Sequence, residues 1–362
     1  MSGVRFPAPP PKNIEKAWFL KARLFVHSEV SMKESFIPKP WARNPHIQTI
    51  LGSMKFRLTG KTPTIDNSRE MTIDAGDGIR LLGYYSPQSF LPPRGLVTLI
   101  HGWEGSSDST YIRSMGKYLY EIGYNIFRLN LRDHGNSHHL NEGLFHGALT
   151  EETFQAVRNI SHLSDKIPYY LVGFSLGGNF SLRIALKHSC SEIPRLRHIF
   201  CISPALDPYK ATLSIDKSLP IYRHYFLKKW KRSLQKKQYY FPDIYDFSNI
   251  LREKTCMALT EAIMPHYPDF RSYREYFNRY TLLENALIDL TIPVTIIASE
   301  DDPIVPVADL HELQKNKYLH ISIQKYGGHC GFIDFLPFTC WSEREIANIL
   351  LQERTLNDRS GF

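Results

Sequence analysis

The feature that most constrains the fold is a series of short apolar runs separated by stretches with helical periodicity. A hairpin pattern comes first, in which MTIDA and IRLLGYYS flank the turn residues GDG within 71–86. The apolar runs that follow are 96–102, 124–130, 169–175, 198–203, 294–299 and 320–326. Runs this short and apolar are typical of strands buried on both faces of a parallel sheet, with helices as crossovers. The sequence therefore predicts an α/β fold with a mostly parallel central sheet flanked by helices.

The same periodicity predicts where the helices and the parts of the chain lie. Helices are expected at 110–122, 150–164, 176–189, 306–316 and 341–352. The alternation stops at about 206–290, where aromatic and basic residues are concentrated, so we expect a helical insertion that forms a lid over the carboxyl ends of the strands. The predicted parts are a partly mobile N-terminal extension at 1–35, the first part of the core at 36–205, the lid at 206–290 and the second part of the core at 291–362.

The first residues of the predicted core, 36–51, hold three prolines. Proline interrupts both helices and sheet ladders, so we expect this segment to run over the surface as irregular structure.

Composition narrows the class of protein. The chain has 362 residues, of which 43% are hydrophobic, which is enough for a large core and too apolar for a disordered chain. Its five cysteines are widely spaced and include no CxxC pair, so they favour a reducing compartment over a disulfide framework or a zinc site. The N-terminus lacks an apolar signal core, and no apolar run reaches bilayer length. We therefore expect a soluble, cytoplasmic protein.

A serine nucleophile is indicated at the end of one predicted strand. The run 169–175 ends in GFSLG at 173–177, and a helical pattern follows directly. In a GxSxG elbow a tight turn exposes the serine, and the glycines let the strand and the helix pass closely. The competing dinucleotide-binding pattern GxGxxG requires glycine where Ser175 stands, and it is absent. Ser175 is therefore the predicted nucleophile.

The groups that such a serine needs follow other predicted strands. His329 lies in a glycine-rich loop after the last run, and it is the predicted base. Of two adjacent aspartates after the run 294–299, the pattern D-x-apolar-x-P favours Asp302 as the acid and leaves Asp301 as a turn residue. The oxyanion hole is expected from two backbone amides, that of Leu176 after the nucleophile and that of Trp103 in HGWEG. A triad of this kind requires no metal and no cofactor.

These motifs resemble those of the YheT-like branch of the α/β-hydrolases, the AB hydrolase 4 family, over about residues 36–350. The similar segments are FIPKPWARNPHIQTI near the N-terminus, HGWEGSS at the oxyanion loop, GFSLGGN at the elbow and GGHCGF at the histidine loop. The resemblance implies an α/β-hydrolase fold and esterase or lipase activity through Ser175, Asp302 and His329. The sequence RDHG at 132–135 departs from the R-G-x-G form of YheT, in a loop expected to be structural.

The predicted lid contains the most basic run of the chain, 220–238. Tyr222, Phe226, Trp230 and Leu234 recur there every four residues, so one helical face is apolar and lysines and arginines fill the remainder. We expect the apolar face to pack and the basic side chains to be solvated. A sharper hypothesis is that this helix touches an anionic membrane surface and admits an acyl chain. Tyr222, Phe226 and Trp230 predict an apolar pocket for medium-chain or lipid-like esters. Three aromatic residues later in the lid support the same prediction, namely Tyr273, Tyr276 and Phe277.

Other functions receive less support from the sequence. A net charge of +8 is compatible with nucleic-acid binding. However, no nucleic-acid motif is present, and the basic residues concentrate in one helix. Acyl transfer to an alcohol uses the same acyl-enzyme and stays an alternative, as does a non-catalytic binding protein with a hydrolase fold. Cys330, beside the predicted base, is interpreted as a packing residue. A metal site is not favoured at the loop cluster of Asp133, His134, His138 and His139.

Overall fold

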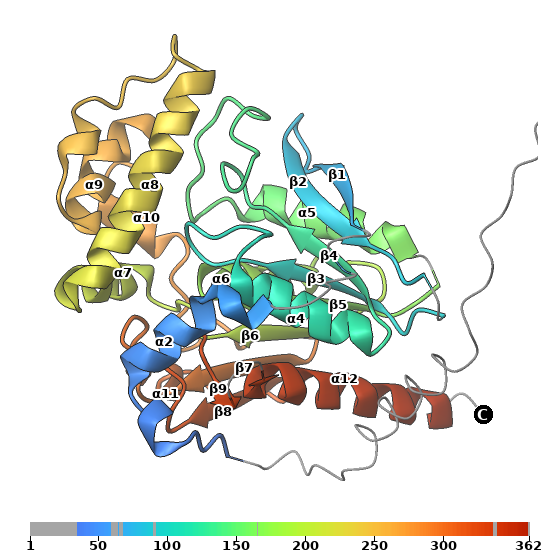
Figure 1. Ribbon diagram of the computed structural model, residues 1–362. Coiled ribbons are helices and arrows are strands. Elements are labelled where there is room, and N and C mark those ends of the chain that lie inside the picture. The colour runs from blue at the N-terminus through green and yellow to red at the C-terminus, as the bar shows by residue number, and fades with distance from the viewer. Residues whose placement is uncertain are drawn as a thin grey trace, which may run out of the picture. The chain divides into compact units, whose positions relative to one another are not determined.

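The computed structural model describes residues 35–58, 64, 68–89, 92–164, 166–335 and 339–360 (Figure 1). The N-terminal extension predicted at 1–35 lies outside the described residues, apart from its last one. Residues Phe36–Ala347 form one compact unit, which contains the sheet and the candidate site.

An eight-stranded sheet forms the centre of this unit, in the order β1-β2-β4-β3-β5-β6-β7-β8. β1 and β2 form the predicted antiparallel hairpin at one edge, and β2 also pairs antiparallel with β4. The remaining pairs are parallel, which confirms the mostly parallel sheet. The strands are β1 Arg69–Asp74, β2 Arg80–Ser86, β3 Leu96–Ile100, β4 Asn125–Leu129, β5 Tyr169–Phe174, β6 Leu196–Ile202, β7 Val294–Ser299 and β8 Leu319–Gln324, with a separate pair formed by β9 Ile333–Phe335 and β10 Thr339–Cys340.

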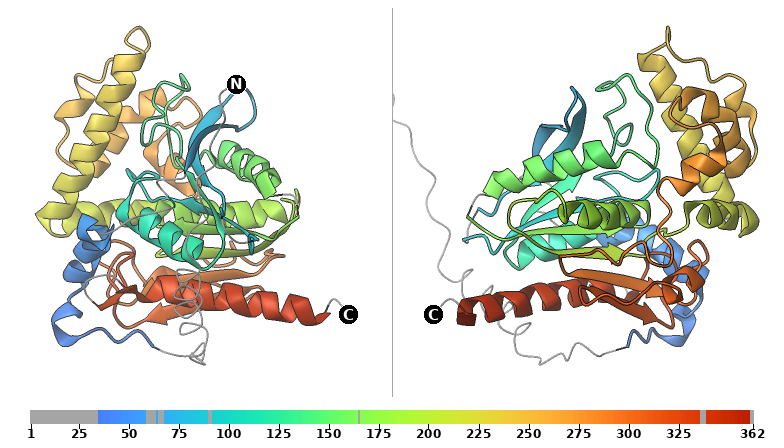
Figure 2. Two further views of the ribbon diagram at one scale, coloured as in Figure 1. Left: turned by 45° about the vertical axis from the view of Figure 1, so that its right-hand side comes forward. Right: turned by 180° about the vertical axis from the view of Figure 1, so that it is seen from behind.

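Helices connect the parallel strands and cover both faces of the sheet. The crossover helices are α4 Thr110–Glu121, α5 Thr150–Ser161 and α6 Leu176–His188. Figures 1 and 2 show α4 on one face of the sheet and α5 and α6 on the other. The remaining helices of the core are η1 Pro40–Ala42, α2 Pro45–Ser53, η2 Lys55–Leu58, η3 His162–Ser164, α11 Ala308–His311 and α12 Trp341–Ser360. No helix among the described residues combines the length and the apolar character that a membrane span requires.

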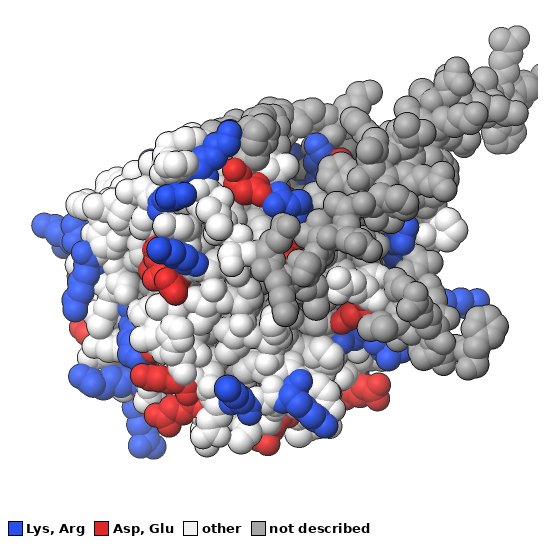
Figure 3. Space-filling model, turned by 90° about the horizontal axis from the view of Figure 1, so that it is seen from below, with Lys and Arg blue, Asp and Glu red and all other residues white. Residues whose placement is uncertain are grey.

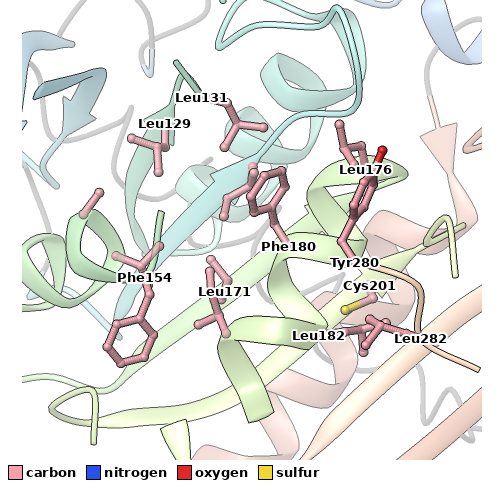
Figure 4. Packing of buried hydrophobic residues seen from close by; sticks show 14 of the residues in the cluster. Leu129, Leu131, Phe154, Leu171, Leu176, Phe180, Leu182, Cys201, Tyr280 and Leu282 are labelled. Carbon is pink, nitrogen blue, oxygen red and sulfur yellow. The ribbon is translucent and has the colours of Figure 1, made fainter. Parts of the chain in front are cut away.

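The core lies between the sheet and the helices on its faces. Strands β3, β4 and β5 are buried at every position, because a central parallel strand is covered on both sides. Figure 4 shows how Phe154 of α5, Leu171 of β5 and Phe180 of α6 lie in this cluster. Truncation of one such fully buried phenylalanine to alanine costs about 3–5 kcal/mol. This packing holds the strand ends, and the loops that follow them, in fixed positions.

The expectation of irregular structure at 36–51 is wrong for its second half, where α2 forms. Pro45 occupies the first helical turn, a position at which its missing N–H costs nothing, and the Asn44 side chain caps the helix by accepting the N–H groups of His46 and Ile47. The proline therefore starts a helix instead of preventing one.

Two other predicted helices differ in length. Within 306–316 only Ala308–His311 is α-helical, because the N–H of Gln314 pairs with Glu284 O and not with a carbonyl of its own helix. The helix predicted at 341–352 continues to Ser360 in α12. Tertiary pairing ends the first helix early.

The segment between β6 and β7 is helical and contains no strand, as Figure 2 shows from two sides. We call residues 206–290 the helical insertion. Its helices are α7 Pro208–Lys217, α8 Pro220–Tyr240, η4 Ile250–Arg252, α9 Cys256–Ile263, η5 Met264–His266 and α10 Tyr273–Asn278.

The net positive charge is not gathered on the face drawn in Figure 3. On that face the described Lys and Arg side chains are interspersed with Asp and Glu. The density of basic side chains is instead high along α8, where residues 217–242 include no acidic residue.

Candidate active site

Ser175 lies in a strained turn between β5 and α6. Its φ of 52° is in the left-handed region, which a side chain with a Cβ rarely adopts. Gly177 makes the turn compatible with its surroundings, because a Cβ there would lie 2.4 Å from Ile100 O of the neighbouring strand. The sequence GFSLG thus forms a tight strand-to-helix elbow with the serine at its tip.

The three residues predicted as a triad are brought together from distant parts of the chain. His329 Nε2 lies 2.9 Å from Ser175 Oγ, and His329 Nδ1 lies 2.8 Å from Asp302 Oδ2. A hydroxyl in contact with an imidazole that a carboxylate orients is an arrangement able to deprotonate the hydroxyl as it attacks a carbonyl.

The two adjacent aspartates occupy different places. Asp302 accepts the N–H groups of Ile304 and Val305 on Oδ1, at 2.8 and 2.9 Å, which leaves Oδ2 directed at the imidazole. Asp301 accepts the N–H of Gly328 at 2.8 Å and makes no recorded contact with the imidazole. Asp301 therefore holds the loop that precedes His329, and Asp302 is the carboxylate in contact with the histidine.

The environment of His329 favours its protonated form. Burial by itself lowers the pKa of the imidazole, but the charge of Asp302 and the neighbouring Cys330 thiol outweigh that effect, and the pKa lies well above its usual value. The proton accepted from a serine is therefore stabilised on this imidazole.

Two backbone N–H groups near Ser175 are available to a ligand. On either side of Trp103, the N–H of Gly102 donates to Tyr111 Oη at 3.0 Å and that of Glu104 to His134 Nε2 at 3.2 Å. Among the described residues, no recorded hydrogen bond uses the N–H of Trp103 itself or that of Leu176 at the start of α6. These are the two amides that the sequence predicted for an oxyanion hole.

A pocket opens on Ser175 between the strand ends and the helical insertion. Trp103 and Leu176 line it from the core side, and Phe226 and Trp230 of α8 line it from the insertion. The Phe226 ring stacks on that of Trp103 with the centroids 5.3 Å apart. The remaining aromatic walls come from Phe145, His146, Tyr267, Tyr276, Phe277 and Tyr280. Two of the expected aromatics, Tyr222 and Tyr273, do not line this pocket.

A model of the alpha/beta hydrolase fold family matches residues 95–336 of this chain. The chain belongs to the α/β-hydrolase fold family. It is 24% identical to YheT of Escherichia coli strain K12 over 89% of this chain and 95% of that protein. It is 22% identical to Phospholipase ABHD3 of Mus musculus over 83% of this chain and 74% of that protein. Protein ABHD15 of Homo sapiens is 28% identical over 53% of this chain, and the match spans only 41% of its length.

In this α/β-hydrolase the side chains of the loop cluster Asp133, His134, His138 and His139 make contacts within the protein. His134 Nδ1 lies 2.7 Å from Arg132 O, while its Nε2 accepts the N–H of Glu104 in the loop after β3. Burial lowers the pKa of His134 to about 4, so the ring is neutral and able to accept. His138 Nε2 lies 2.8 Å from Ser233 Oγ, and the His139 ring packs beside Tyr240. His134 thus supports the loop that follows β3.

Helix α8 packs as expected along its apolar face, with Tyr222, Trp230 and Leu234 buried. The expectation that all its basic side chains are solvated is wrong for Lys237, which is 1% exposed. Its ammonium group donates to Asp133 Oδ1 at 2.9 Å in the loop after β4. The hydrolase core and the helical insertion are therefore joined by a buried ion pair that the periodicity of the helix does not reveal.

Two residues of the N-terminal segment FIPKPWARNPHIQTI contact the site, and nothing in the sequence indicates that role. Gln48 and Thr49 of α2 contact the histidine loop, although α2 lies almost 300 residues before it. The sequence Asn44-Pro45, which is typical of a helix start, could have predicted α2. The Cys330 thiol donates a hydrogen bond to Ile202 O, with Sγ 3.7 Å from the oxygen.

Proposed function

We propose that this protein is a serine hydrolase that cleaves carboxylic esters through an acyl-enzyme. The observation that carries the proposal is the Ser175–His329–Asp302 line, with contacts of 2.9 and 2.8 Å, at the mouth of an apolar pocket. The strained φ of Ser175 supports it, because strain of this kind accompanies exposed nucleophiles at such elbows.

In the proposed reaction Ser175 Oγ attacks the ester carbonyl carbon while His329 Nε2 takes its proton. The carbonyl electron pair moves to oxygen, and the N–H groups of Trp103 and Leu176 stabilise that oxyanion. Collapse of the tetrahedral intermediate expels the alkoxide, which receives the proton from His329. Water, deprotonated by the same imidazole, then releases the acid and restores Ser175. Asp302 keeps Nδ1 protonated and stabilises the imidazolium formed in each half-reaction.

The acyl group is proposed to be medium-chain or lipid-like. Phe226 and Trp230 of α8 form an aromatic wall next to Ser175, which favours hydrocarbon over charged substituents. A relative of this chain is named as a phospholipase, which fits an acyl chain in this position.

Peripheral contact with an anionic membrane is part of the proposal. On α8, Lys228, Arg232 and Lys236 are exposed. His46 Nδ1 of α2 lies 3.0 Å from Tyr222 Oη, so α2 lies beside the start of α8. Two side chains of α2, Ile47 and Ile50, are exposed, as is Met54 directly after the helix. An apolar surface beside a basic one is typical of proteins that bind the lipid interface. A reducing, cytoplasmic location is proposed from the five free cysteines.

The catalytic proposal is tested with p-nitrophenyl esters of rising chain length, comparing the wild type with Ser175→Ala. We expect activity that is lost in the variant and a rate maximum at medium chain length. Equal rates in both proteins would remove Ser175 from the proposed role.

The membrane proposal is tested by sedimentation with phosphatidylserine vesicles and with phosphatidylcholine vesicles. The triple variant with glutamate at Lys228, Arg232 and Lys236 is expected to lose binding to the anionic vesicles. A double variant with glutamate at the exposed Lys315 and Lys317, away from α8, serves as the control. Equal binding by the triple variant and the control contradicts the proposal.

A further inference from the structure

The loop that carries His329 is held from outside the sheet by α2. His329 donates its backbone N–H to Thr49 Oγ1 at 2.9 Å. The Thr49 hydroxyl has only one proton, and it donates that proton to Pro45 O at 2.8 Å, one helical turn earlier. The hydroxyl is therefore locked in the orientation that presents a lone pair to the histidine.

Gln48 holds the same loop four residues further on. Its Oε1 accepts the N–H of Ile333 at 2.8 Å, and its Nε2 donates to Ile333 O at 2.9 Å and to Ala42 O at 2.8 Å. The side chain is 0% exposed, so all of these bonds are shielded from water. A buried amide paired in this way fixes the backbone opposite it, because every alternative position leaves polar groups unsatisfied.

Glycines allow the loop to lie directly on the helix. A Cβ on Gly328 would lie 2.3 Å from Pro45 O, and one on Gly331 would lie 2.5 Å from Gln48 O. The loop on both sides of His329 thus touches the α2 backbone. Neither Gln48 nor Thr49 lines the pocket.

We propose that Thr49, supported by Gln48, is a positioning residue that holds the imidazole of His329 between Ser175 and Asp302. This inference rests on the proposed function, since it concerns the base of that reaction. Thr49 acts on the backbone of His329 and does not touch the substrate. The role of α2 is then to set the distance from Nε2 to Ser175 Oγ, which the sheet alone does not determine.

The chain offers a matched control for the test. Thr153 of α5 is 1% exposed, and its hydroxyl donates to Leu149 O at 2.9 Å, one turn earlier, as that of Thr49 does. Thr153→Val removes the same intrahelical bond and the same atoms. Thr49→Val additionally leaves the N–H of His329 without its acceptor. Thr49 also hydrogen-bonds the side chain of Tyr222, so the difference between these variants reports the contact with the histidine loop together with the contact to Tyr222.

Hydrolysis of a p-nitrophenyl ester is measured for the wild type, Thr49→Val, Thr49→Ser and Thr153→Val, with Ser175→Ala as the blank. We expect kcat of Thr49→Val to fall about 10–100-fold with KM within about twofold, because small displacements of a reacting group are costly while the pocket is unchanged. Thr49→Ser keeps the hydroxyl and should restore kcat to within about threefold of the wild type. Thr153→Val should keep the wild-type kcat.

The pH profile separates positioning from general damage to the fold. The imidazole faces Asp302, Cys330 and Ser175, and a loosened loop weakens the contact with Asp302. The acid limb of kcat/KM should therefore move to lower pH in Thr49→Val and stay in place in Thr153→Val.

Equal kcat values and acid limbs for Thr49→Val and Thr153→Val, with Ser175→Ala inactive, overturn the inference and leave the proposed function standing. Equal rates for the wild type and Ser175→Ala overturn both. If Thr49→Val does not fold, Thr49→Ala, which also lacks the hydroxyl, replaces it in the same comparison with Thr49→Ser.

Discussion

The buried ion pair between α8 and the loop after β4 makes a sharp prediction about stability. Lys237 Nζ donates to Asp133 Oδ1 at 2.9 Å, to Asn141 O at 2.6 Å and to Gly143 O at 2.9 Å. The side chains of the pair are 1% and 5% exposed. All three protons of the ammonium group are therefore used inside the protein, and water replaces none of these bonds.

Lys237→Met keeps an unbranched side chain of similar length and removes the charge. It leaves the Asp133 carboxylate buried with one remaining recorded donor, the N–H of Phe145 at 2.8 Å, and it removes the donor from two carbonyls. Breaking a buried pair in this way costs about 3–5 kcal/mol of unfolding free energy. The neighbouring Lys236 is exposed, so Lys236→Met should change that free energy by less than about 0.5 kcal/mol.

The loss should depend on pH. Burial raises the pKa of Asp133, and the charge of Lys237 opposes the rise, so removing the lysine raises the pKa further. A carboxyl whose pKa is higher in the folded than in the unfolded state takes up a proton on folding. Its contribution to stability is largest at low pH and is lost as the pH rises through the folded-state pKa. The difference in unfolding free energy between the wild type and Lys237→Met should accordingly be smaller at pH 5 than at pH 8.

Urea unfolding followed by circular dichroism and by tryptophan fluorescence measures these differences. The double variant Asp133→Asn/Lys237→Met lacks both charges of this pair and should regain part of the lost stability. If Lys237→Met unfolds at the same urea concentration as Lys236→Met at both pH values, the reasoning about this pair is refuted.

The remaining predictions concern the proposed reaction. Asp302→Asn should lower kcat by about 10³–10⁴-fold, because it favours the wrong imidazole tautomer. Asp301→Asn should keep most of the activity. Similar kcat values for the two variants would contradict the assignment of the acid. Since Asp302 raises the pKa of His329, activity should be lost as the pH falls below that raised pKa, and a pH profile of kcat/KM on Asp302→Asn should show the acid limb displaced to lower pH. Ala211 lines the pocket, so Ala211→Phe should shorten the preferred acyl chain while sparing p-nitrophenyl acetate, and an unchanged chain-length profile would place the acyl chain elsewhere.

Much of the fold followed from periodicity, because the burial of a strand leaves a local trace in the sequence. The expectation of burial on both faces is wrong for β8, which lies at the edge of the sheet and is only partly buried. The six apolar runs correspond to β3–β8, and the hairpin before them to β1 and β2. The lengths of the helices were predicted less well from the sequence. α11 ends shortly before Gln314, whose N–H pairs with Glu284 O, and no pattern within the helix predicts a partner 30 residues away.

For the site, the sequence indicated that Ser175, Asp302 and His329 follow β5, β7 and β8, and parallel strands bring their carboxyl ends to one edge. It did not identify the residues that hold these groups. Thr49 precedes His329 by 280 residues, and Asp133 precedes Lys237 by 104. Such pairs leave no mark on the periodicity of either segment.

Local patterns in the sequence indicated the strands, the elbow and the candidate reacting groups, since each pattern extends over only a few residues. Only the packing of the folded chain shows that α2 contacts the histidine loop and that one lysine of a basic helix is buried. The physical reason is that burial and hydrogen-bond pairing depend on what lies opposite a side chain. That neighbour is set by the packing of the whole unit.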